Sequence, residues 1–430
     1  MRSGYARLGI TPPLGTTMYG WGDRDTDHGC DAVHDDLYAR ALYLEHDGQT
    51  ALILSYDLLF LGRDESDRIK GAIGTRLDLA PRQILLNCSH THDGPALGSW
   101  GYAAYTNLPD PQYLDDLVAV SVTAAIRARD AAREVTLWAG ATRSRLPVSR
   151  RQPDGTGGIN WAPYPEGEIC DHLPVCLLRD NNGAPVCLLF SVSCHPSTTK
   201  SFSISADYPG TATARLARHL GADVAMFLQG CGGDTKACVN ADGDGGRGWR
   251  SGTWEDVDEA GRIVAEEVIG ALDAGLTRME PAIRTAILEM EWPLEPPPAR
   301  AELEELTTNS KRLIRLWATR QLEVLDQGRP RPGTVPLLVQ NIALADSLRL
   351  VALEGEPVAG IGRLLRGHFP QGITFPLGYS NGQGLYLPTE AMLPEGGYEV
   401  ESAYEYGWPA KLAPGFEVIL HRVLDAWAAL

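Results

Sequence analysis

Two histidines, His90 and His92, stand where an apolar run ends, within residues 87–95. Side chains at positions i and i+2 of an extended strand share a face, so both imidazoles can enter one site before Asp93 begins a turn. Neutral imidazole is a common metal ligand, and such a pair at a strand end can start a metal site. The alternative is a turn whose histidines bond backbone or water, and an isolated pair leaves that alternative open.

Other predicted strands end at polar residues of metal-binding type. His195 follows the run 186–192, and Glu356 follows the run 347–353. Tyr386 lies in a later block at 379–386. Ligand sites in open α/β sheets collect at the carboxyl ends of strands. Together these positions favour one shared site, although each residue alone has a purely structural explanation.

The elements that must position these residues alternate between strands and helices, which predicts an α/β fold. A strand at 51–59, a helix at 64–77 and a strand at 84–88 predict a β-α-β unit. Residues 150–167 predict a long loop, and residues 242–248 a surface loop. Further strands are predicted at 135–139, 175–178, 186–192, 224–228, 338–342 and 347–353, and further helices at 111–133, 210–220, 255–276 and 299–325. No repeat or linker divides the chain, so residues 1–430 are predicted to form a single domain.

Composition narrows the class of protein. The chain has 430 residues, 44% of them hydrophobic, which suits a globular fold with a sizeable core. Its 55 acidic and 38 basic residues give a net charge of −17, which argues against nucleic acid as a partner. The start of the chain lacks the apolar run of a secretory signal, and no later stretch predicts an integral membrane segment. We expect a cytoplasmic protein with a small-molecule substrate. The sequence is compatible with a homo-oligomer but does not determine the oligomeric state.

Short blocks along the chain occur in the order found in one known family. Residues 89–95 read SHTHDGP against the family's SHTHSGP, and residues 205–210 read SADYPG against SADFPG. The other matching blocks are residues 10–15 (ITPPLG), 195–198 (HPST), 233–234 (GD), 355–363 (GEPVAGIGR), 379–386 (YSNGQGLY) and 398–399 (YE). On these blocks the chain resembles the catalytic domain of the neutral/alkaline, non-lysosomal ceramidases.

The resemblance implies mixed β-sheets flanked by helices, and one zinc ion (Zn2+) per chain. In that family two histidines, a glutamate and a tyrosine hold the zinc. The ligands implied here are His90, His195, Glu356 and Tyr386. His92 and Tyr398 would lie beside the reacting centre, as would an active-site arginine. Arg150 is the candidate for that arginine, and Arg151 is the alternative.

The implied chemistry suits these residue types. Imidazole and carboxylate ligands suit zinc, which with an open position lowers the pKa of a water molecule to about 7. His92 is placed to take a proton from the water and pass it to the leaving amine. Arg150 and Tyr398 are candidates to donate hydrogen bonds to the developing oxyanion. For Tyr386 and Tyr398 the alternative is packing with a hydrogen-bonded hydroxyl.

The sequence also departs from the family. Secreted ceramidases carry an immunoglobulin-like C-terminal domain, whereas this chain ends soon after the tyrosine block, so we expect the catalytic domain without it. The family's GD-SPN stretch reads GDTKAC at residues 233–238, which disfavours a serine nucleophile. Lys236 in that stretch could contact a substrate anion or be exposed to solvent on a loop, and exposure is the favoured prediction. Asp93 replaces a serine and Pro357 an aromatic residue, which predicts a pocket rebuilt for another substrate.

These observations lead to a functional hypothesis. We expect a zinc-dependent hydrolase that cleaves a C-N (amide) bond through a metal-activated water, with a substrate other than ceramide itself. One alternative is the same zinc site hydrolysing an ester, a lactone or a glycosidic bond. Another is a non-catalytic binding domain that retains the fold. Retention of all four ligand types favours an enzyme.

Overall fold

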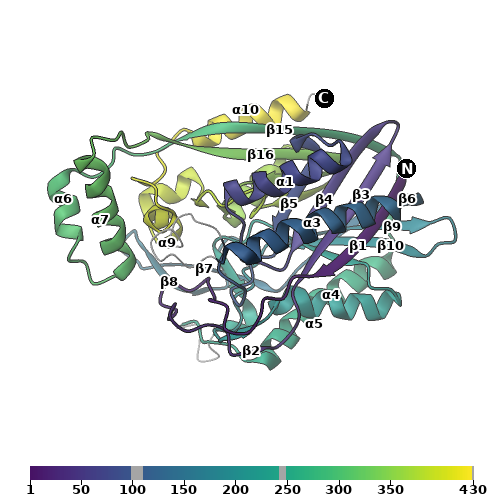
Figure 1. Ribbon diagram of the computed structural model, residues 1–430, viewed down its shortest axis with the longest axis horizontal. Helices are drawn as coiled ribbons and strands as arrows, with labels where there is room; N and C mark the ends of the chain where they lie inside the picture. The colour runs from purple at the N-terminus through teal and green to yellow at the C-terminus, as the bar shows by residue number, and fades with distance from the viewer. Residues whose placement is uncertain (98–109, 242–247, 429–430) are drawn as a thin grey trace.

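A large mixed β-sheet runs through the middle of the molecule (Figure 1). The computed structural model describes residues 1–97, 110–241 and 248–428, so the loop predicted at 242–248 lies almost wholly outside the described residues. In the order in which they pair, the strands are β12 (Ala225–Gln229), β10 (Pro185–Val192), β9 (His172–Asp180), β6 (Arg133–Arg143), β1 (Arg2–Gly9), β3 (Tyr38–His46), β4 (Gln49–Tyr56) and β5 (Ile84–Cys88), and β14 (Thr277–Met279) pairs with β6. Most pairs are antiparallel, but β5 and β12 each pair in parallel with their neighbour.

The predicted β-α-β unit is confirmed. Strand β4, helix α1 (Arg63–Leu77) and strand β5 follow one another, and the two strands pair in parallel. Alternate residues of β4 face different layers: Leu52 and Leu54 pack with α1 and α3 (Pro111–Asp130), whereas Ile53 packs toward a second sheet. Helices α4 (Asp207–Leu220) and α5 (Trp254–Ala274) pack on the other end of the large sheet.

The second sheet packs on the first. Its strands are β15 (Pro281–Pro293), β16 (Thr334–Ala345), β17 (Leu348–Leu353) and β19 (Ile373–Leu377). Leu350 and Phe375 from this sheet share a core cluster with Ile53 and Leu137 from the large one. Its opposite face is covered by α8 (Ala359–Gly367) and α10 (Phe416–Ala428). The chain therefore forms an α/β fold of mixed β-sheets flanked by helices, as predicted.

Within the described residues, short strands form three small sheets beside the two large ones. Strands β13 (Thr235–Ala237), β7 (Pro147–Pro153) and β8 (Ile159–Tyr164) make one of them, and β18 (Glu356–Pro357) pairs with β20 (Tyr386–Leu387) in another. A two-stranded sheet joins β2 (Ala32–Val33) and β11 (Ser203–Ile204). The remaining short elements are η1 (Pro81–Gln83), η2 (Cys238–Asn240), η3 (Glu390–Glu395), α9 (Tyr398–Glu401) and η4 (Ser402–Tyr406).

Two sequence predictions were wrong. The loop expected at 150–167 is largely the β7-β8 hairpin, because its turn residues concentrate where Asp154 accepts backbone N–H groups from Thr156 and Gly158. The single helix expected at 299–325 is two helices, α6 (Arg300–Leu306) and α7 (Arg312–Asp326). Between them, side chains such as Thr307 and Asn309 bond the backbone and so compete with the helical pattern.

Across residues 1–97, 110–241 and 248–428, no helix has the length and apolar character needed to cross a bilayer.

A buried ion pair joins β3 to the end of β4. Arg40 Nη1 donates to Asp57 Oδ1 over 2.7 Å, and both side chains are buried. Replacing Arg40 by Met leaves the carboxylate uncompensated, and we expect a loss of about 3–5 kcal/mol in unfolding free energy. Urea unfolding followed by circular dichroism measures this loss. The matched control is Arg2→Met on neighbouring β1, whose pair with Glu45 is exposed and should be worth about 1 kcal/mol or less. Equal losses of unfolding free energy in the two variants would contradict a stabilising role for the buried Arg40–Asp57 pair.

Candidate metal centre

Four segments far apart in the sequence bring the predicted ligands together. His90 follows the carboxyl end of strand β5, and His195 follows the carboxyl end of strand β10, both in the large sheet. Glu356 and Tyr386 are directly opposed in the parallel β18-β20 pair. His90, His195, Glu356 and Tyr386, the four side chains named from the sequence as ligands, are all buried and meet at one point.

Their ligand atoms are separated by nearly uniform distances. His90 Nε2 lies 3.2 Å from His195 Nε2 and 3.3 Å from Glu356 Oε2. His195 Nε2 lies 3.5 Å from Glu356 Oε2 and 3.3 Å from the Tyr386 hydroxyl. Four ligands in a tetrahedron around zinc at 2.0–2.1 Å would be about 3.4 Å apart. These four of the six separations are therefore close to those of a tetrahedral metal site.

Backbone carbonyls orient both histidines. His90 Nδ1 bonds to the carbonyl of Leu59 at 2.9 Å, and His195 Nδ1 bonds to the carbonyl of Gly232 at 2.7 Å. With the proton on Nδ1, each Nε2 presents a lone pair to the shared centre, as metal-ligating histidines do. Burial, assisted by the charge of Arg150, lowers the pKa of His195 to about 3, which keeps this imidazole neutral. Facing lone pairs repel one another unless a cation lies between them.

Glu356 completes the donor set. Its Oε1 accepts hydrogen bonds of 2.6 Å from Gln383 Nε2 and from the Tyr406 hydroxyl. Its Oε2 is buried and has no hydrogen-bond partner among the described residues, although it faces both ligand histidines. An orphaned carboxylate oxygen that faces two imidazole lone pairs fits a divalent cation.

Backbone strain marks the same place. His90 has a φ of 66° and Tyr379 a φ of 51°, both in the left-handed region that side chains rarely adopt. The two rings pack against each other with centroids 4.2 Å apart. Strain of this kind persists where surrounding structure compensates for it, and it is concentrated at functional sites.

His92 lies beside the four ligands. Its Nε2 is 3.2 Å from His90 Nε2, and the ligand atoms of His90, His92 and His195 all lie within 4.8 Å of one another. Its ring packs edge-on against Trp21, with centroids 5.1 Å apart. Gly20 abuts the same ring, where an added Cβ would come within 3.1 Å. By position alone His92 could act as a further ligand or as a proton carrier.

The structure separates the two candidate arginines. Arg150 Nη2 donates to the Tyr386 hydroxyl at 3.0 Å, and its Nε donates to Glu399 at 2.7 Å. Arg151 points elsewhere and bonds the other oxygen of Glu399 and a carboxylate oxygen of Glu395. Arg150 is therefore the one of the two arginines that contacts Tyr386, and one carboxylate, Glu399, bonds both guanidinium groups.

Tyr398 lies at the edge of the site. Its ring centroid is 5.4 Å from that of Tyr386, and the Arg150 guanidinium lies 5.4 Å from its ring. Its hydroxyl donates to Glu405 at 2.9 Å, and the side chain is partly exposed. All seven side chains predicted for the site thus gather in one region.

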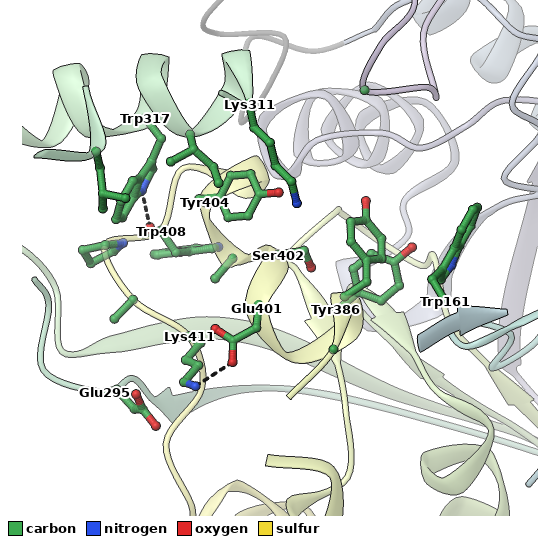
Figure 2. Close-up of a pocket in the computed structure, with 18 of the residues that line it drawn as sticks. Trp161, Glu295, Lys311, Trp317, Tyr386, Glu401, Ser402, Tyr404, Trp408 and Lys411 are labelled. Carbon is green, nitrogen blue, oxygen red and sulfur yellow. Dashed lines mark hydrogen bonds and ion pairs between the residues drawn. The ribbon is translucent and has the colours of Figure 1, made fainter. Parts of the chain in front are cut away.

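A cavity of about 960 Å³ opens onto this region. His92, Arg150, His195 and Tyr386 line one part of it. Figure 2 shows Trp317, Trp408, Glu401 and Lys411 away from Tyr386 and Trp161 in the same cavity; there Trp317 donates to the carbonyl of Trp408, and Lys411 pairs with Glu401. Its other walls come from α6, α7 and residues 397–411, and include Leu306, Ile314 and a run of three prolines at 296–298. The far part of the cavity is mixed, because these apolar groups lie beside the charged side chains of Glu295, Glu302, Lys311, Glu401 and Lys411.

Lys236 is buried, although the sequence predicted that it would be exposed on a loop. The side chain is 4% exposed and lines the cavity. Strand β13 holds it, since Lys236 pairs with Val148 of β7 and forms a bridge with His195. Burial, together with the charge of Arg150, lowers the pKa of Lys236 to about 8. The prediction was wrong because local composition suggested a loop, whereas pairing with β7 buries the segment.

Asp93 also has a different role from the one predicted. Its buried carboxylate bonds Arg24 at 3.1 Å and the hydroxyl of Thr199, and it does not line the cavity. Arg24 in turn donates to the carbonyl of His92 at 3.0 Å. Asp93 therefore supports the loop that carries the histidines and does not reshape the pocket.

Several residues of the centre were not predicted from the sequence. Gln383 and Glu399 lie inside blocks that matched the family, so their positions offered a signal. Tyr406, which bonds Glu356, follows no motif. Trp21 and Trp161, which line the cavity, come from segments with no recognisable pattern.

Comparison with known proteins identifies the fold. A solved structure titled as a ceramidase complexed with C2 superimposes with a TM-score of 0.74 at 15% sequence identity, and the neutral ceramidase from Pseudomonas aeruginosa gives 0.74 at 16%. In both cases the match covers 99% of this chain and 74% of the other. No protein-family model and no curated protein sequence matches the chain. The chain thus has the fold of the neutral ceramidases, which confirms the structural part of the resemblance.

Proposed function

We propose that this chain is a zinc-dependent hydrolase that cleaves the C-N bond of an amide other than ceramide itself. One observation supports the proposal most strongly. Potential metal-ligand atoms of His90, His195, Glu356 and Tyr386 are buried and lie 3.2–3.5 Å apart in the four pairs measured, and the Glu356 oxygen among them has no hydrogen-bond partner within the described residues. The ceramidase resemblance implies hydrolysis of an amide bond. The two solved structures with the same fold are titled as ceramidases.

In this proposal His90, His195, Glu356 and Tyr386 hold one zinc ion per chain. The ion would supply a water molecule whose pKa is lowered to about 7. His92 Nε2 would accept a proton from the attacking water and return it to the nitrogen of the leaving amine. Its packing against Trp21 and Gly20 keeps the ring close to the ligands.

Arg150 and Tyr398 are proposed to stabilise the oxyanion, Tyr398 by exchanging its hydrogen bond to Glu405 for one to the substrate oxygen. Glu399 holds the Arg150 guanidinium in place, so that the group needs little reorganisation when charge develops on the substrate oxygen. Donors fixed in advance within a largely enclosed site are worth more than the same donors in water. The single-domain organisation, a cytoplasmic location and a homo-oligomeric state stay predictions from the sequence.

Metal content tests the ligand set. We expect about one zinc per chain in the purified protein, and loss of the metal in His195→Ala because one of four donors is removed. Elemental analysis by mass spectrometry after dialysis measures both. The matched control is His46→Ala, since His46 lies at the far end of β3 and should retain zinc. Wild-type protein without metal after preparation in zinc would refute the proposal.

Activity tests the role of His92. We expect His92→Ala to keep its zinc and to lose turnover by about 10²–10⁴-fold, because it removes the proton carrier and leaves the four ligands in place. Loss of metal in this variant would show that His92 is a ligand. The assay uses panels of acyl-amides, esters, lactones and glycosides, with and without chelator. Activity on amides that chelator abolishes and zinc restores is the expected result, and activity insensitive to chelator would exclude the mechanism.

The arginines give a paired test. We expect Arg150→Met to lower kcat/KM by about 10²–10³-fold, because it removes a donor that faces the reacting centre. Arg151→Met should cost less activity, since Arg151 bonds Glu399 and Glu395 and does not contact Tyr386. Steady-state kinetics on zinc-loaded variants with matched metal content measures both. A larger loss in Arg151→Met would reverse the assignment.

A further inference from the structure

Lys236 is a buried cation in the wall of the substrate cavity. It shares that wall with His92, Arg150 and His195, and only 4% of its surface is exposed. Its register partner Val148 lies two residues before Arg150 on β7, so Lys236 and Arg150 come from adjacent strands. Lysine is seldom buried this deeply without a paired acid.

Among the described residues, the ammonium group has no carboxylate partner within ion-pair distance. Its Nζ donates to the carbonyl oxygen and the hydroxyl of Ser197, each at 3.2 Å. These two bonds use two of its three N–H donors. Within the described ranges no acidic group lies within 4.0 Å of Nζ, the limit for an ion pair. Burial of an uncompensated charge is costly, which implies a compensating gain when the cavity is filled.

Three indole rings surround the same ammonium. Nζ lies 5.2 Å from the centroid of Trp21, 5.8 Å from that of Trp161 and 5.9 Å from that of Trp249. Contacts of this kind stabilise a cation. They help to keep the charge in place between substrates, and they leave the third N–H available to an anion.

Local charge adds to the effect. Glu399 is shared by Arg150 and Arg151, and Arg151 also pairs with Glu395. Two carboxylates therefore match the two guanidinium groups, whereas Lys236 has no ion-pair partner among the described residues. A cation without an ion pair in a cavity wall attracts anions.

We propose that Lys236 binds a carboxylate of the substrate next to the scissile amide, so that the substrate class is an N-acyl amino acid. This inference rests on the proposed function. The carboxylate lies on the Lys236 side, and the acyl chain extends toward the apolar side chains of Trp317 and Trp408. Hydrolysis adds water across the amide: the acyl carbon gains the oxygen, the C-N bond breaks and the amino acid nitrogen takes the proton.

A matched ligand pair tests binding apart from turnover. N-(octylsulfonyl)glycine and N-(octylsulfonyl)ethanolamine replace the amide by a sulfonamide that is not hydrolysed, and they differ in carrying a carboxylate or a hydroxyl. Isothermal titration calorimetry on the full-length zinc-loaded protein should show about tenfold tighter binding of the glycine compound, from one charge-assisted hydrogen bond. The ratio of dissociation constants should fall to about one in Lys236→Met.

The control is Lys411→Met, a cavity lysine whose charge Glu401 already matches. It should retain the preference for the carboxylate. Lys236→Met should also melt no lower than the wild type, because an apolar side chain of similar length replaces a buried charge. A wild-type protein without carboxylate preference would overturn the inference, and so would a preference that survives in Lys236→Met.

Turnover separates this inference from the proposed function. Hydrolysis of N-octanoylglycine should exceed that of N-octanoylethanolamine by a similar factor in kcat/KM, and Lys236→Met should remove the difference. Hydrolysis of both compounds at equal rates would leave the amidase standing and refute the subsite. Carboxylate-selective binding that depends on Lys236, without any hydrolysis of amides, would establish the subsite and refute the proposed function.

Discussion

The structure depends on three acceptor atoms that point at one another. His90 Nε2, His195 Nε2 and Glu356 Oε2 lie 3.2–3.5 Å apart and are buried. Lone pairs and a carboxylate repel at such distances, so the surrounding structure must hold them there, and a cation between them would relieve the repulsion. The carbonyls of Leu59 and Gly232 fix the imidazoles, while Gln383 and Tyr406 fix the carboxylate.

The frame around these atoms is also polar and buried. Asn87, at the end of β5, donates to the carbonyl of Gly378 and to the hydroxyl of Ser380, and it accepts the backbone N–H of Gln229. It thereby joins strand ends from the large sheet to the loop after β19. A fully bonded network of this kind specifies one arrangement, because any shift would leave buried groups unpaired. The strained backbone of His90 is held inside the same network.

The contrast between Asp93 and Lys236 shows what composition alone conceals. Asp93 was expected to alter the pocket and Lys236 to be exposed on a loop, whereas Asp93 is buried beneath the histidine loop and Lys236 faces the cavity. The hairpin at β7-β8 was missed for a related reason. Its glycines and prolines suggested a loop, yet they concentrate in the turn, and Arg150 and Lys236 reach the site only because β7 and β13 pair.

The sequence by itself determined the fold class, the β-α-β unit and the identities of the four candidate ligands. Those features follow from local periodicity and from short motifs, which depend on neighbours in the chain. The tertiary structure alone decided which arginine faces the centre, which groups orient the ligands and where Lys236 points. These depend on pairing between segments up to about 250 residues apart, such as Arg150 with Glu399. The hydrogen bonds and burial that decide such pairings exist only after the chain has folded.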